Sequence, residues 1–248
     1  MRSATRPVSL TWPVSLTWLV SRLAIAANGC EPALTERLAA FFPAFFFFAN
    51  PDLKPESSTG WDAGFEQGFA HGVVRFGVTY YHNLIHDLIT TVPDPSMPGG
   101  TTYGNIGRAT TNGIESFIAW EPAKELLLRV DYTYTEATDD VLQQELLRRP
   151  KNKGTFLAQW QATSAWQLSL DVLAVGTWVD GNRDFSIPRL DAPGYTTVTL
   201  ATSYDLTPHL VVFGRINNLF DRHYENPVGF LQPSIGAYAG IKVTFGGP

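Results

Sequence analysis

A strict alternation of apolar and polar side chains is the feature that most limits how this chain can fold. In residues 126–135 the even-numbered residues are all apolar or aromatic, and Arg129, Asp131 and Thr133 lie between them. Successive side chains of a β-strand point to opposite faces of a sheet, so the segment is predicted to be a strand with one apolar and one polar face. The same alternation recurs at 73–88, 153–161 and 166–178. The chain is therefore expected to be all-β.

From residue 60 onward the alternation predicts about nine strands, near 60–69, 73–89, 104–120, 125–137, 153–162, 166–179, 194–204, 209–218 and 235–245. Tight turns are expected at 70–72, 121–124, 163–165 and 205–208. Long loops are expected at 90–103, 138–152, 180–193 and 219–234. Short turns and long loops alternate strictly along the chain. Outer-membrane barrels show this pattern, because their turns are short on the periplasmic side and their loops are long outside the cell.

Composition limits the class of protein further. Only 17% of residues are charged, 13% are aromatic, and the mean hydropathy is -0.04. A disordered chain would have more charge and fewer aromatics, and a helical membrane protein would need apolar runs of about 20 residues. The net charge of -5 gives no support for nucleic-acid binding. The single cysteine, Cys30, allows neither an internal disulfide nor a cysteine metal cluster.

Tryptophans gather near both ends of the predicted strands. Trp120, Trp160 and Trp166 lie beside short turns, and Trp61 and Trp178 lie near the long-loop ends. Aromatic residues at both strand ends are typical of the girdles at the two membrane interfaces. A soluble up-and-down barrel with its apolar face inward is the alternative, but strands of 10–16 residues would be long for it.

Residues 1–37 do not fit the strand pattern. The hexapeptide PVSLTW occurs at 7–12 and again at 13–18, behind Arg2 and Arg6. This start is interpreted either as signal-like or as the beginning of a truncated product. The first and last predicted strands run in the same direction, so about nine antiparallel strands would not close by themselves. The chain is therefore expected to form part of a larger barrel.

Motifs in the predicted strands and loops resemble the C-terminal barrel portion of TonB-dependent outer-membrane receptors, of the cobalamin- and siderophore-receptor-like kind. Residues 50–58 (NPDLKPESS) with Gly64-Phe65-Glu66 are similar to one family segment. Residues 105–115 are similar to a second strand signature, and 146–152 (LLRRPKN) to a loop of the cobalamin-receptor branch. The last two strands are similar at 217–224 and 236–240. The resemblance covers roughly residues 38–245.

The resemblance implies that residues 38–248 form an antiparallel transmembrane β-barrel segment, related to the C-terminal part of a barrel of about 22 strands. It implies a Gram-negative outer-membrane protein that is a component of TonB-dependent uptake of a ferric siderophore, cobalamin or a similar ligand. The family's plug domain, which contacts TonB, is expected to be absent, so the chain is expected to be a fragment. Outer-membrane lipid and the barrel-assembly machinery are the other expected partners. A passive pore or structural barrel without a plug is the alternative.

Several residues are candidates for contacts of this kind. Arg148 and Arg149 in an outer loop suit a planar anion such as a ligand group or a lipid phosphate, although a solvated loop is the simpler interpretation. Tyr238 and Phe245 are assigned to the terminal strand and to assembly, as lipid-facing or interfacial aromatics. Polar side chains predicted to face the barrel lumen are Arg75, Glu115, Arg129, Asp131, Asp171 and Arg215.

No catalytic or metal site is predicted. His82 and His86 would lie about 13 Å apart on a strand, whereas zinc ligands lie about 2.1 Å from the metal. Serine, histidine and aspartate residues occur without a spacing that favours nucleophilic catalysis. An enzyme is therefore not expected, nor is a cofactor.

Overall fold

The structure is a computed structural model that describes residues 26–30, 47–48, 50–94, 100–182 and 186–245. The interpretations given for 1–25 and 31–37 lie outside these described residues. The regular secondary structure of the described residues consists of β-strands and one short 3-10 turn, η2 (Ala70–Gly72). Among those residues, no helix has the length and apolar character to cross a membrane.

Nine long strands account for most of the described residues, and they confirm the predicted number. They are β3 (Glu56–Phe69), β4 (Val74–Pro93), β5 (Thr101–Ala123), β6 (Leu126–Asp139), β8 (Asn152–Gln161), β9 (Trp166–Val175), β12 (Tyr195–Thr207), β13 (Leu210–Asn217) and β14 (Gly236–Val243). Several are longer than the alternation alone predicted, because their outer ends extend beyond the apolar stretch into polar sequence.

Five short strands complete the description. The longest, β1 (Ala26–Cys30), pairs antiparallel with β3, and β2 (Phe47–Phe48) pairs parallel with β5. Three others belong to the loop regions: β7 (Gln144–Glu145) pairs with β6, while β10 (Trp178–Asp180) and β11 (Leu190–Ala192) form a separate hairpin.

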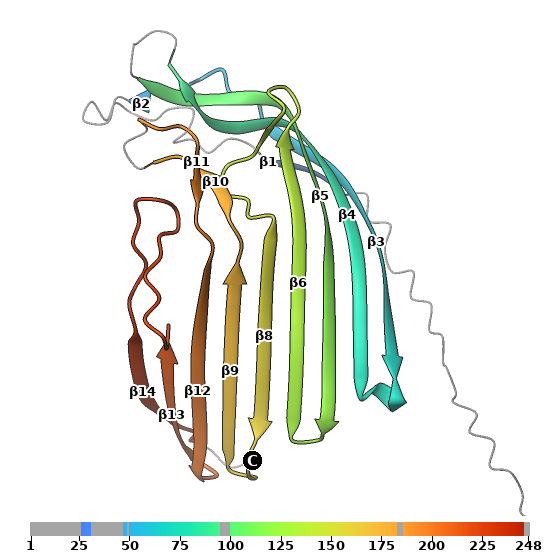
Figure 1. Cartoon of the computed structure of the whole chain (residues 1–248), viewed down its shortest axis with the longest axis vertical. Helices are drawn as coiled ribbons and strands as arrows, with labels where there is room; N and C mark the ends of the chain where they lie inside the picture. The colour runs from blue at the N-terminus through green and yellow to red at the C-terminus, as the bar shows by residue number, and fades with distance from the viewer. Residues whose placement is uncertain (1–25, 31–46, 49, 95–99, 183–185, 246–248) are drawn as a thin grey trace, which may run out of the picture.

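The long strands form one continuous sheet in which each pairs antiparallel with its neighbours in the order β3-β4-β5-β6-β8-β9-β12-β13-β14. Figure 1 shows all the tight turns at the lower end of the sheet and all the longer connections at the upper end. The sheet is curved like a section of a barrel wall, and no pairing among the described residues joins β14 to β1 or β3. The predicted alternation of short turns and long loops is therefore confirmed.

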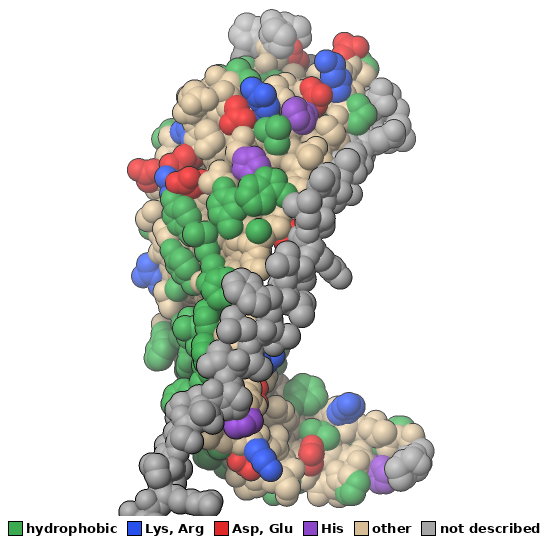
Figure 2. Space-filling model, turned by 90° about the vertical axis from the view of Figure 1, so that its right-hand side faces the viewer, with side chains coloured by type: hydrophobic (Ala, Val, Ile, Leu, Met, Phe, Trp, Pro, Cys, Tyr) green, Lys and Arg blue, Asp and Glu red, His purple; other side chains and the backbone are tan. Residues whose placement is uncertain are grey.

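The two faces of the sheet differ in chemistry. Large apolar side chains stand exposed on one face, including Ile118 at 56%, Val130 at 49% and Ile241 at 68%. Figure 2 shows such side chains gathered in a band along one side of the molecule. A soluble barrel with its apolar face inward would bury these side chains. The exposed band instead fits a face that meets lipid.

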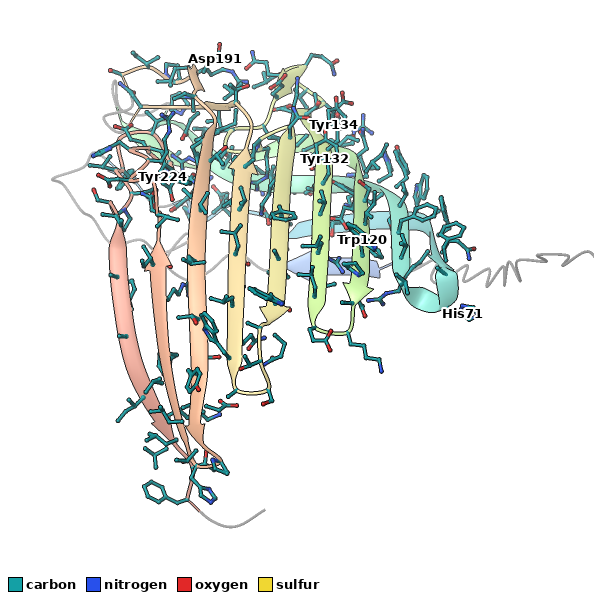
Figure 3. All side chains as sticks on the ribbon, turned by 60° about the horizontal axis from the view of Figure 1, so that its bottom comes forward. His71, Trp120, Tyr132, Tyr134, Asp191 and Tyr224 are labelled. Atoms are coloured by element: carbon teal, nitrogen blue, oxygen red, sulfur yellow. The ribbon has the colours of Figure 1, made fainter. Side chains whose placement is uncertain are left out.

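The aromatic prediction is confirmed at the short-turn end and wrong for Trp178. Trp120, Trp160 and Trp166 are 47%, 49% and 39% exposed, and Figure 3 shows Trp120 near the turns. Trp178 is only 5% exposed, because β9 ends at Val175 and the chain leaves the sheet before the β10 hairpin. Its indole therefore packs among the outer loops instead of joining a lipid-facing girdle.

Candidate functional site

The sheet register places the six predicted lumen-facing residues on one face, opposite the exposed apolar band. Arg129 pairs with Ala119 and Leu157, and Ala119 also pairs with Arg75. Directly opposed residues of paired strands point to the same side of a sheet. The register across the neighbouring strands places the other four predicted residues on the same face: Glu115, Asp131, Asp171 and Arg215.

Two groups of ion pairs lie on this polar face. The guanidinium of Arg129 donates to both carboxylate oxygens of Asp131, with a shortest distance of 2.6 Å, and lies 4.5 Å from the ring centroid of Phe117. Arg75 lies 4.0 Å from the Glu66 carboxylate and 3.8 Å from that of Glu121. Arg75 and Arg129 are thus neutralised by neighbouring carboxylates, whereas no ion pair among the described residues involves Glu115, Asp171 or Arg215.

Tyr238 lies on this polar face, so its assignment as a lipid-facing aromatic is wrong. Its backbone pairs with Arg215, and the two side chains share one side of the β13–β14 ladder. With Gln159 and Ser203 they line an open hollow of 580 Å³ on the polar face. Phe245 follows β14 and is 90% exposed. A role of either residue in assembly stays a prediction.

The outer loops converge on a buried carboxylate, Asp180, at the end of β10. Its side chain has no solvent exposure. The Nε of Arg148 donates to Asp180 Oδ1 over 2.8 Å, as does the backbone amide of Gly181. The backbone amide of Val228, from the loop between β13 and β14, donates to Oδ2 over 2.9 Å. We call these four residues the loop clasp, since they join three separate loops through one carboxylate.

The hydrogen bonds of the loop clasp decide the charge of Asp180. Burial favours the neutral acid and by itself raises the pKa of the carboxyl. The Arg148 guanidinium and the amides of Val228 and Gly181 stabilise the carboxylate more, so the pKa of Asp180 lies below its usual value. The clasp therefore holds an ionised carboxylate at neutral pH.

An aromatic cluster lies beside the loop clasp. The ring of Tyr195 stacks on Tyr224 at 4.0 Å between centroids and meets Trp178 edge-on at 6.0 Å. Figure 3 shows Tyr224 among the loops at the upper end of the sheet. Trp178, Tyr195 and Ala192 are the buried members of this small core, and Leu173 and Val228 pack against it. Burial raises the pKa of the Tyr224 phenol.

The two predicted anion-binding arginines have different surroundings. Arg148 is held by Asp180, yet its side chain is still 54% exposed. Arg149 is exposed and donates only to the carbonyl of Arg148 among the described residues, over 3.3 Å. Nearby, Lys151 forms a short charge-assisted hydrogen bond to Glu145, and this raises the pKa of Lys151. Ligand contact by Arg148 or Arg149 remains a prediction.

Two of the segments that carry the family resemblance are in direct contact. Asn105 accepts a hydrogen bond from the amide of Lys54 over 2.9 Å and donates to the carbonyls of Lys54 and Asp87 over 3.1 and 2.5 Å. Leu53, beside Lys54, is only 4% exposed. The first segment is therefore fastened to the outer ends of β4 and β5 by Asn105, and also by Asn50, which donates to the carbonyl of Tyr103 over 2.9 Å, and Glu56, which accepts from the amide of Ile89.

Asn218 has a similar structural role in the loop after β13. It is 6% exposed and has a left-handed backbone with φ of 50°, which asparagine tolerates better than most residues. Its side chain accepts from the amide of Arg222 and donates to the carbonyls of Arg222 and Pro233. Asn218 therefore fixes the turn by which the chain leaves β13.

Sequence reasoning missed Asp180 and Asn105 as organising residues. Asp180 lay in a predicted loop with no motif, and its partners are 32 and 48 residues away in the chain. Asn105 lay inside a quoted motif, but the motif did not show that Lys54 was its partner.

An antiparallel sheet with an exposed apolar band, a polar opposite face and all its long loops at one end defines the wall of an outer-membrane-type β-barrel. Comparison with protein families agrees. The family model "TonB dependent receptor-like, beta-barrel" matches residues 8–219, and the chain belongs to this family.

The relatives are transport receptors. The chain is 34% identical over 177 residues to the vitamin B12 transporter BtuB of Photobacterium profundum, a match that spans 71% of this chain and 28% of that protein. Its fold is similar to that of the copper transporter OprC, with a TM-score of 0.67 and 16% identity over 88% of this chain and 36% of that one. Its fold is also similar to that of the ferric enterobactin receptor PfeA of Pseudomonas aeruginosa, with a TM-score of 0.67 and 20% identity. That match covers 80% of this chain and 33% of the receptor. The chain thus spans about a third of the length of these proteins.

Proposed function

We propose that this chain forms part of the wall of a TonB-dependent outer-membrane receptor that imports a small ligand such as cobalamin or a ferric siderophore. The observation that carries the proposal is the two-faced sheet, whose long loops all lie at one end. Its apolar face suits lipid, its polar face suits a water-filled lumen, and its loop end suits ligand capture outside the cell. Membership of the family supports this assignment.

The wall would act by binding and orienting the ligand, without covalent chemistry. The ion pair of Arg129 with Asp131 adds polar, hydrated surface to the lumen without adding net charge. Polar side chains around Tyr238 offer hydrogen bonds to whatever fills the lumen, which in the family is a plug domain. The loop clasp keeps the mouth in one shape, because it ties three loops to one carboxylate.

Ligand uptake tests the proposal. The complete receptor gene that includes the coding sequence of this chain is expressed in a Gram-negative strain that lacks its own cobalamin and siderophore receptors, with and without TonB. Accumulation of labelled cobalamin or ferric siderophore that requires TonB is the expected result. Flux of small solutes that is independent of TonB would support a passive pore instead. Absence of both activities from correctly folded outer-membrane protein would refute transport.

A further inference from the structure

A second, smaller hollow of 180 Å³ lies under the loop clasp, at the loop end of the polar face. Its apolar wall comes from Leu173, Val175 and the aromatic cluster, and its cationic rim from Arg148 and Lys153. The register places Lys153 directly opposite Val175, and Val175 opposite Tyr195, so these side chains leave the sheet on the same side. We infer that this hollow binds a carboxylate attached to a flat apolar ring, as one subsite of the imported ligand.

The charge of the hollow favours an anion. None of the residues that line it is acidic. No ion pair among the described residues involves Lys153, which is exposed. Arg148 uses its Nε for Asp180, and its terminal nitrogens make no hydrogen bond within the described residues. A guanidinium edge of this kind forms paired hydrogen bonds with a carboxylate.

The loop clasp makes Arg148 a prepared binding group. An arginine side chain that is free in solution loses rotamer entropy when it binds. Here the buried carboxylate of Asp180 already orients the guanidinium, and Asp180 is itself held by the amides of Gly181 and Val228. Much of the ordering cost is therefore met in the unliganded protein. Asp180 acts as a positioning residue, while Arg148 and Lys153 make the contacts.

The size and wall of the hollow select the apolar part of the group. A volume of 180 Å³ equals about six waters at about 30 Å³ each. It admits a single ring but not a whole macrocycle, and it is smaller than a complete ligand pocket of about 300–1,000 Å³. Tyr195, which is 8% exposed, receives a hydrogen bond on its hydroxyl from Asn226 over 3.1 Å. This bond fixes the tyrosine ring as a rigid side of the hollow.

The inference rests on the proposed function for the identity of the natural ligand, but its test does not need uptake. The full chain is purified in detergent micelles, its β-structure is checked by circular dichroism, and binding of 4-fluorobenzoate is measured by fluorine NMR. The neutral amide 4-fluorobenzamide serves as the matched probe. Benzoate is expected to bind at least about fivefold more tightly than benzamide, since a charged hydrogen bond is lost with the amide.

Two variants complete the test. Lys153→Gln is expected to weaken benzoate binding at least about fivefold and to leave benzamide unchanged. Lys124→Gln removes an exposed lysine from the tight turn between β5 and β6, outside the hollow, and is expected to change neither. Equal binding of the two probes, or equal loss in both variants, would overturn the subsite. TonB-dependent uptake with no selective benzoate binding would refute the subsite alone, whereas selective binding without uptake would refute only the proposed function.

Discussion

Removal of the buried carboxylate at the centre of the loop clasp should release the loop between β13 and β14. In Asp180→Ala the amides of Gly181 and Val228 lose their acceptor, and Arg148 loses its partner. A buried amide left without a partner costs about 1–3 kcal/mol. Both amides lie in partly buried residues, so we take the lower part of that range for each. The ion pair adds at most about 1 kcal/mol, because Arg148 is half exposed. The total is about 2–4 kcal/mol for local opening.

Hydrogen–deuterium exchange measures this opening directly. Because about 1.4 kcal/mol corresponds to a tenfold change, the amide of Val228 should exchange about 30- to 700-fold faster in Asp180→Ala. Amides in the middle of β6 should keep their protection, since local opening need not involve the sheet. Asp191→Ala is the matched control, because Asp191 is an exposed carboxylate in the same hairpin. Unchanged exchange at Val228, or equal acceleration throughout β6, would refute the reasoning.

Three further predictions concern pH, the fastened segment and the two faces. The folded pKa of Asp180 is lowered, so the stabilisation by the loop clasp is complete above about pH 4 and is lost as the pH falls through the folded pKa. The amide of Val228 should therefore exchange faster only at such low pH. Faster exchange near pH 6 would contradict this prediction. Asn105→Ala removes three hydrogen bonds worth about 0.5–1.5 kcal/mol each, so the amide of Lys54 should lose protection while β6 keeps it, and proteolysis at residues 50–56 should increase. Leu170→Lys should cost about 2–4 kcal/mol in urea titrations of folding into lipid bilayers, whereas its polar-face neighbour Ser169→Lys should cost much less; equal costs would contradict the assignment of the faces.

Much of the fold was predictable because alternation is a local property. The number of long strands, their turns and the side on which Arg129 and Asp131 lie all follow from a period of two along each strand. The prediction was wrong where this period was extended beyond the end of a strand. In the sequence Trp178 continues the alternation of β9, but the strand ends three residues earlier and the side chain is buried.

The candidate site was less predictable, because its contacts join distant parts of the chain. Arg148 was singled out as an anion-binding residue, but nothing in its neighbourhood showed that Asp180, 32 residues on, would orient it. Tyr238 was assigned to lipid because it is an aromatic of the last strand. Its register with Arg215 depends on the pairing of β13 with β14 across a loop that spans residues 218–235, and that pairing puts it on the polar face.

The sequence by itself determined a two-faced antiparallel sheet with long loops at one end, because strand geometry converts the order of side chains directly into faces. Only the tertiary structure decided which loops meet. It placed a guanidinium and an exposed lysine around one small apolar hollow, and it placed the buried carboxylate of Asp180 against that guanidinium. Arg148 and Asp180 come from two different loops and Lys153 from β8, so a hydrogen bond between loops and the sheet register together set their spacing. No local pattern could encode it.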